Sequence, residues 1–209
     1  MNGHSSSSSS STARSGRLRE RLREATAEAI LAAAEEVFSE DGFAAARMEQ
    51  IAARAGVAVG TLYNHFEDRD ALVAALLDSR RSALLDRIDA ALSRATGAAL
   101  PERLSTFAEA LFEHAEQHGR LLAVLAEAGQ GPARSKSGAV RELHARATAL
   151  LQEGVESGAL RTNGAELLAV AFVGVLRGVL VHDLTLSDRA APAVRAAAVV
   201  ELFLRGAAR

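Results

Sequence analysis

One short segment in the first third of the chain gathers side chains whose chemistry suits the surface of DNA. Asn64 can pair with the edge of an adenine, Thr61 can bond a base or a phosphate, and the methyl groups of Val59 can pack on a thymine methyl. Tyr63 and His65 can donate hydrogen bonds to phosphates. The segment holds no Arg or Lys, so the bidentate contact to guanine is missing. On their own, the same residues are equally consistent with the polar face of an ordinary helical hairpin.

The spacing of apolar residues places this segment on the second of two short helices. The first helix is predicted from four residues at i, i+3, i+4 and i+7: Met48, Ile51, Ala52 and Ala55. Gly56 follows directly and can take the left-handed backbone conformation that ends a helix. The second helix, from about Val59 to Phe66, has Leu62 and Phe66 four residues apart on one apolar face. A helix–turn–helix unit of this size can push its second helix into the major groove.

Residues 35–72 resemble the N-terminal DNA-binding region of the tetracycline-repressor (TetR) family of transcriptional regulators. The motifs that carry the resemblance are Gly42-Phe43, Ile51-Ala52, Ala55-Gly56-Val57, Gly60-Thr61-Leu62-Tyr63, His65-Phe66 and Asp68-Arg69. The resemblance places a phosphate contact at Arg69. The full set of predicted DNA contacts is Arg47, Val59, Thr61, Tyr63, Asn64, His65 and Arg69. Arg47 and Ala58 stand where the family usually has Ser or Thr to cap the two helices, and the loss of such a cap typically costs about 1 kcal/mol.

The composition bounds the fold and the class of protein. Almost half of the 209 residues are apolar, Ala and Leu are abundant and only three residues are proline, which favours an all-α protein with a large core. The absence of Cys excludes disulfides, thiolate catalysis and zinc-finger sites. The formal net charge of −2 gives no global basic signature, so DNA binding must rest on local charge.

We expect a cytoplasmic protein that makes no membrane contact. The N-terminus has no apolar segment typical of a signal peptide. The longest apolar run, Leu167–Leu186, is interrupted by Arg177, His182 and Asp183, which argues against a membrane span.

About nine helices are expected in three segments. Residues 1–21 form a Ser- and Arg-rich tail that we expect to be disordered. Residues 22–67 form the helix-turn-helix DNA-binding domain, and residues 68–209 form a larger domain for effector binding and dimerisation. The arginines that end the tail are either the start of a solvated helix or a basic arm that reaches DNA phosphates or the minor groove. Gly119 is expected to interrupt the helices of the larger domain.

The last two helices, about residues 165–186 and 192–205, are predicted to pair two copies of the chain. The first of them is apolar nearly all round, so it must be buried on more than one side. In the TetR family the last two helices of each subunit commonly form a four-helix dimer interface, and the resemblance implies the same here. The predicted interface residues are Val170, Val173, Gly174, Gly178, Leu180, Leu184, Val199 and Phe203. The alternative is that these residues form the core of a monomer.

A small-molecule pocket in the larger domain is also implied by the resemblance. The candidate lining residues are Phe107, Leu111, His114, Leu122, Leu125, His144, Phe172, Leu176 and Arg177, an apolar wall with a few polar groups. Each of them can equally belong to the core. His114 and His118 lie four residues apart, a spacing that can hold a metal ion, but a solvated polar face explains it as well. There is no nucleophile motif in a strand–turn–helix context and no dinucleotide fingerprint, so we predict no enzyme, cofactor or metal site.

These predictions combine into one function. We expect a homodimeric transcriptional regulator, most simply a repressor, that occupies a palindromic double-stranded DNA operator and is released by an unknown small-molecule effector. The alternative from another class is a helical scaffold protein that uses the helix-turn-helix for protein contacts. Salt-dependent DNA binding separates the two.

Overall fold

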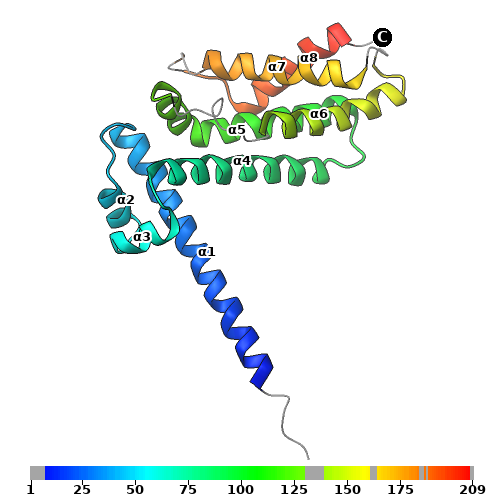
Figure 1. The fold of residues 1–209 in the computed structure, drawn as a ribbon. Helices are drawn as coiled ribbons and strands as arrows, with labels where there is room; N and C mark the ends of the chain where they lie inside the picture. Colours follow the sequence, from blue (N-terminus) through cyan, green and yellow to red (C-terminus); the bar gives the residue numbers. More distant parts are fainter. Residues whose placement is uncertain (1–7, 130–138, 161–163, 184–185, 187, 208–209) are drawn as a thin grey trace, which may run out of the picture. The chain divides into compact units, whose positions relative to one another are not determined.

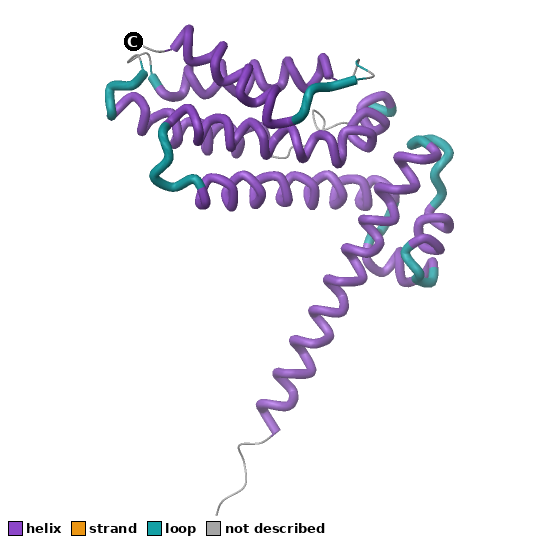
Figure 2. Tube along the Cα trace, turned by 180° about the vertical axis from the view of Figure 1, so that it is seen from behind, coloured by secondary structure: helices purple, strands orange, loops and turns teal. Residues whose placement is uncertain are grey.

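The computed structural model describes residues 8–129, 139–160, 164–183, 186 and 188–207. All regular structure in these residues is helical apart from a single bridge residue, as Figure 2 shows. The eight helices, in chain order, are α1 (Ser8–Asp41), α2 (Met48–Arg54), α3 (Val59–His65), α4 (Arg69–Arg94), α5 (Leu100–Glu127), α6 (Ala139–Glu156), α7 (Ala165–Asp183) and α8 (Pro192–Ala207) (Figure 1). The predicted all-α class is therefore confirmed, with one helix fewer than expected.

The chain divides into two compact units, the first ending at Leu76 and the second beginning at Leu77. The division falls inside α4, whereas the predicted boundary lay at the start of that helix. The reason is that the first two turns of α4 bury Leu72, Val73 and Leu76. These turns therefore belong with the helices that precede them.

The core of the first unit holds the short helices in place. α1 contributes a buried stripe that includes Ile30, Ala34, Val37 and Phe38, and α2 packs against it. This stripe begins at Ile30, yet α1 starts at Ser8. The prediction that residues 1–21 are disordered is wrong from Ser8 onward. Arg, Leu and Glu in residues 17–24 are strong helix formers that extend an already nucleated helix.

The core of the second unit is formed mainly by two pairs of helices, α5 with α8 and α6 with α7. α5 runs through Gly119 without a break, which accounts for the missing ninth helix. A glycine inside a helix costs only about 1 kcal/mol relative to alanine. The apolar stripe that buries Leu111 and Phe112 before Gly119 continues with Leu121 and Leu125 after it, and their burial offsets that cost.

Ion pairs join the second half of α4 to α5 and α6. Arg146 donates two hydrogen bonds of 2.7 Å to the carboxylate of Asp89, and the hydrogen bonding lowers the pKa of Asp89 and raises that of Arg146. Arg87 reaches Glu113 on α5 at 3.1 Å. These pairs are half-exposed, so we expect each to contribute at most about 1 kcal/mol to stability.

One buried ion-pair cluster joins α5, α7 and α8. The guanidinium of Arg195 on α8 donates to Asp183 at the end of α7 and to Glu116 on α5. It also lies over the ring of Phe112, with 4.7 Å between Cζ and the ring centroid. Arg195 and Asp183 are 8% and 6% exposed. Charges this deeply buried are tolerated only when they are paired.

By length and composition, α7 alone among the described helices could cross a membrane, contrary to the expectation from its charged residues. One such helix is weak evidence for a membrane span, because the core helices of other proteins have the same composition. In this structure one face of α7 buries Leu168, Phe172 and Leu176 in the core. Its opposite face exposes apolar side chains, among them Leu167 and Val170.

Candidate nucleic-acid interface

The turn between α2 and α3 is made by Gly56. Its φ of +70° lies in the left-handed region, where a side chain would be strained. The N–H of Val57 donates to the carbonyl of Ala52 at 3.0 Å and closes the turn. α3 then starts after Ala58, which provides no side-chain cap. The predicted departure from a capped helix is therefore present in the structure.

The side chains of α3 divide between a buried and an outward side. Leu62 is fully buried and Phe66, directly after the helix, is nearly so. Val59, Tyr63 and Asn64 are exposed, with Tyr63 at 46%. The buried pair seats the helix, and the three exposed side chains lie together on its outward side.

Two of the predicted contact residues are only partly exposed. Thr61 and His65 are half-buried, and the ring centroid of His65 lies 6.2 Å from that of Phe66. Both flank the outward face and can contribute from its edge.

Arg47 precedes α2 and keeps its side chain exposed. The backbone N–H of Arg47 donates to Oε1 of Gln50 at 3.0 Å, and Nε2 of Gln50 donates to Asp41 at 3.3 Å. Gln50 thus supplies one half of a capping box that lacks its hydroxyl half. The guanidinium of Arg47 is left outside this arrangement, where it can meet a phosphate.

Arg69 opens α4 and stacks on aromatic rings. Its Cζ lies 4.0 Å from the ring centroid of Phe43 and 5.5 Å from that of Phe38. Within the described residues, Nε and Nη2 are enclosed and have no hydrogen-bond partner. The guanidinium thus helps to hold the start of α4, and a phosphate contact from it would have to be made at the edge of this stack. The expected cap of α4 is present, since Asp68 accepts from the N–H of Ala71 at 2.7 Å.

Arg54, which the sequence interpretation did not single out, ties α2 to α1. Its guanidinium donates to Glu36 and to Glu40, each at 2.9 Å. These hydrogen bonds, that with Glu40 foremost, raise the pKa of Arg54. The signal was available in the sequence, because Glu36 and Glu40 are four residues apart and so share one face of α1.

The predicted pocket residues separate into core and groove. Phe107, Leu125, Phe172 and Leu176 are buried in the second unit, in keeping with the alternative that they belong to its core. Close packing of apolar helix faces accounts for this burial. Their place in a ligand pocket stays a prediction. His114 is also buried, and its ring centroid lies 4.5 Å from the ring centroid of His118. Leu122 is half-buried.

The other three predicted residues, Leu111, His144 and Arg177, line one groove between α5, α6 and α7. Its volume is about 380 Å³. The remaining lining residues are Leu143, Val170, Val173, Gly174 and Leu180. The groove therefore has apolar walls, two basic side chains and no acidic one, and no set of three or more metal-ligating side chains occurs among the described residues.

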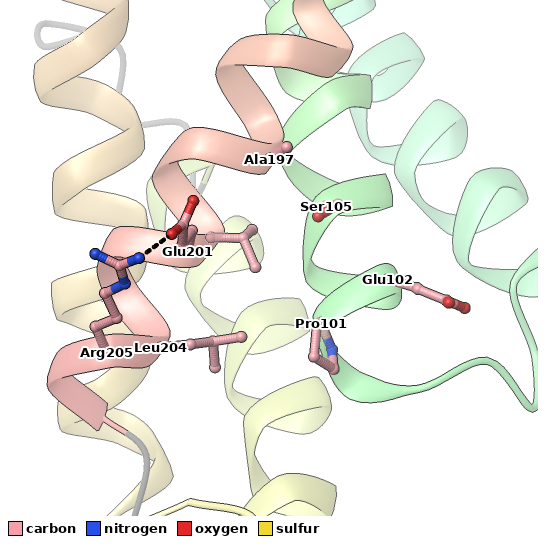
Figure 3. A pocket seen from close by; sticks show the side chains of 8 residues that line it. Pro101, Glu102, Ser105, Ala197, Glu201, Leu204 and Arg205 are labelled. Atoms are coloured by element: carbon pink, nitrogen blue, oxygen red, sulfur yellow. Dashed lines mark hydrogen bonds and ion pairs between the residues drawn. The ribbon is translucent and has the colours of Figure 1, made fainter.

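A second, more open groove of about 660 Å³ was not expected from the sequence. It lies where α8 passes the first turns of α5, and Figure 3 shows Pro101 and Ser105 on one side with Ala197 and Leu204 on the other. Its exposed surface is almost entirely apolar, although Glu102 and the ion pair between Glu201 and Arg205 also line it.

The predicted interface residues also separate. Val173, Val199 and Phe203 are buried in the core of the second unit, which is the alternative to their predicted place in a dimer interface. Leu180 is half-buried, and Leu184 lies outside the described residues. Val170, Gly174 and Gly178 are exposed. The exposed apolar surface of α7 and α8 also includes four side chains absent from the predicted set: Leu167, Val181, Val194 and Leu202.

Comparison with known proteins places this helix-turn-helix in a family. Residues 30–76 match the family model described as bacterial regulatory proteins, tetR family. The regulator UidR of Escherichia coli K12 is 46% identical over 48 residues, which cover 23% of this chain and 24% of UidR. The activator FasR of Mycolicibacterium smegmatis is 38% identical over 96 residues, covering 44% of this chain and 43% of FasR. The repressor Rv3405c of Mycobacterium tuberculosis is 48% identical over 56 residues, covering 27% and 30%. The chain thus spans less than half the length of each relative.

Solved structures match over most of the chain. The TetR regulator SCO0520 of Streptomyces coelicolor has a TM-score of 0.56 at 25% identity, covering 87% of this chain and 98% of that one. FadR of Bacillus subtilis, solved with stearoyl-CoA, has a TM-score of 0.71 at 20% identity, covering 86% and 98%. The second likeness concerns the fold alone. The family model falls on α2, the glycine turn, α3 and the residues that seat them, so residues 30–76 belong to the tetR family of bacterial regulatory proteins, and the helices beyond follow the fold of a TetR regulator.

Proposed function

We propose that this chain is a cytoplasmic transcriptional regulator that binds double-stranded DNA through α3. The observation that carries the proposal is the division of α3 into a buried seat, Leu62 and Phe66, and an outward group, Val59, Tyr63 and Asn64. A rigidly seated helix with small and polar side chains facing outward is what the major groove admits. The family consists of regulatory proteins, in keeping with the expectation that the chain is not an enzyme.

The same proposal includes a homodimer. α7 and α8 expose an apolar surface that contains Leu167, Val170, Val194 and Leu202. An apolar patch of this kind is typical of a protein–protein interface. A two-fold dimer would present two copies of α3 to a palindromic operator.

We further propose that the regulator represses, and that a small molecule in the groove between α5, α6 and α7 releases it. The groove volume of about 380 Å³ is in the range of small-ligand sites. Arg177 and His144 at an otherwise apolar wall favour an organic anion with a hydrocarbon body. Relatives of this chain include both an activator and a repressor, so the sign of regulation is tested by transcription in vitro from the bound promoter.

The first experiment is selection of bound duplexes from a random DNA pool at about 0.15 M salt. Enrichment of a palindrome supports the dimeric regulator. A folded, dimeric protein that enriches no sequence would contradict it and favour the scaffold alternative, in which α3 contacts protein.

Tyr63→Ala tests the role of α3 on the selected operator. We expect an affinity loss of roughly tenfold to a hundredfold, because a specific contact is typically worth about 1–3 kcal/mol. Tyr63→Phe keeps the ring and removes only the hydroxyl, so it isolates the proposed phosphate contact. Fluorescence anisotropy measures both, with unchanged melting temperature as the control for folding. Wild-type affinity in Tyr63→Ala would remove Tyr63 from the interface.

Arg177→Ala tests the groove. Octanoate is expected to raise the melting temperature of the wild type, because a ligand that binds only the folded state stabilises it. Octanol, which has the same chain and no charge, is expected to have little effect, and Arg177→Ala should lose the response to octanoate. Arg205→Ala, which removes an exposed charge outside this groove, is the matched control. Equal responses to octanoate and octanol would contradict the assignment of an anionic ligand.

A further inference from the structure

The N-terminal part of α1 is a helix without a packing partner among the described residues. The buried stripe of α1 begins at Ile30, and every described residue from Ser15 to Ala25 is exposed. Figure 1 shows this part of α1 running clear of α2 and α3. We refer to residues 15–25 as the α1 extension. It carries four exposed arginines, Arg17, Arg19, Arg21 and Arg23.

The rest of the first unit is strongly acidic. Residues 24–76 contain ten Asp and Glu and only three Arg, a net charge of −7. Duplex DNA carries one negative charge per roughly 1.7 Å of its axis. Such a domain therefore repels the DNA that its α3 is shaped to enter, unless positive charge is supplied nearby.

Two of the three arginines in residues 24–76 are already engaged inside the protein. Arg54 is paired with Glu36 and Glu40, and Arg69 is stacked on Phe43 with Nε and Nη2 enclosed. Among these three, Arg47 alone has no ion pair or ring contact within the described residues, and its side chain is exposed. One arginine cannot offset the acidic charge of the domain.

We propose that the α1 extension is a second DNA-binding element, which grips the phosphate backbone and supplies most of the electrostatic affinity. Arg17 and Arg21 are four residues apart, as are Arg19 and Arg23. The four side chains therefore form two rows along the helix. The rows extend over roughly 9 Å of helix axis, a length that faces several phosphates. This inference rests on the proposed DNA-binding function. The family model begins at residue 30, so the extension lies outside the part shared with the family.

The test compares two variants with the same change in net charge. In the first, Arg17, Arg19, Arg21 and Arg23 are replaced by Gln, which preserves helix propensity. In the second, four exposed arginines of the second unit are replaced by Gln: Arg94, Arg120, Arg189 and Arg205. Dissociation constants for the selected operator and for a scrambled duplex are measured from 50 to 300 mM salt.

We expect the extension variant to lose at least about tenfold in affinity at 0.15 M salt. The slope of log K against log salt should fall by about one for every arginine that met a phosphate. The affinity for the operator and the affinity for the scrambled duplex should fall by the same factor, because phosphate contacts carry no sequence information. The control variant should keep the wild-type slope.

Three results would overturn the inference. The first is an extension variant with wild-type slope and affinity. The second is a loss confined to the operator, which would mean that the extension reads bases. The third is an equal loss when Leu18 and Leu22, both exposed, are replaced by Gln, which would assign the extension to an apolar partner. Absence of DNA binding by the wild type would instead refute the proposed function itself.

Discussion

Replacing both Val170 and Leu202 with glutamate is expected to convert the protein from a dimer to a monomer and to weaken operator binding at least about a hundredfold. Both side chains are more than half exposed in the protomer, so the substitutions leave its core intact. In a dimer joined through α7 and α8 they would place four carboxylates in an apolar interface. Each carboxylate buried there without a partner would cost several kcal/mol of the free energy of association. A monomer also loses the effective concentration that joins two half-sites.

Sedimentation velocity at micromolar concentration measures the first effect, and anisotropy with the operator measures the second. The matched control places the same two charges on exposed positions of α4, through Ala83→Glu and Ala90→Glu. That control should remain dimeric. A Val170→Glu, Leu202→Glu protein that still sediments as a dimer would mean that the exposed surface of α7 and α8 is not the interface.

Arg195→Ala is expected to lower the free energy of unfolding of the second unit by about 3–5 kcal/mol. The change leaves the carboxylate of Asp183 buried without its partner and removes the cation from the ring of Phe112. Arg205→Ala is the control, because its pair with Glu201 is exposed and lies within one turn of α8. We expect that control to cost less than about 0.5 kcal/mol.

Urea denaturation followed by circular dichroism measures both variants. The double replacement Arg195→Met with Asp183→Leu should recover most of the loss, because apolar residues can replace a buried ion pair without a desolvation cost. A loss below about 1 kcal/mol in Arg195→Ala would show that Asp183 finds another partner or is hydrated.

The first unit was predictable where its signals are local. Gly56 takes the positive φ that its place after a helical stripe required, and Leu62 and Phe66 are buried as their spacing indicated. For Arg54 the sequence offered only part of the signal, the shared helix face of Glu36 and Glu40, and for Arg69 it offered none, because each role depends on side chains from another part of the chain. A sequence pattern shows which residues share one helix face, but it does not show which part of the chain packs against that face.

The second unit illustrates the same limit more strongly. α7 is apolar nearly all round, so periodicity could not separate Val173, which is buried, from Val170, which is exposed. The lining of the groove was found only in part, since Leu111, His144 and Arg177 meet through the packing of three helices. The break predicted at Gly119 was wrong for a simpler reason. The cost of one glycine inside a helix is smaller than the stabilisation from the apolar residues buried on both sides of it.

The α1 extension and the packed part of α1 are one uninterrupted helix, and this fixes the rotational phase between them. Each residue of an α-helix turns the chain by about 100°. Inserting one residue between Arg23 and Ile30 would therefore swing the arginine rows about a quarter-turn around the axis without altering their composition. Inserting seven would return them almost to register, two turns further out. In this protein the number of residues between the arginines and Ile30 sets the direction in which the arginines point around the helix axis. Related chains with equal charge and a different spacing would therefore face the double helix from different sides.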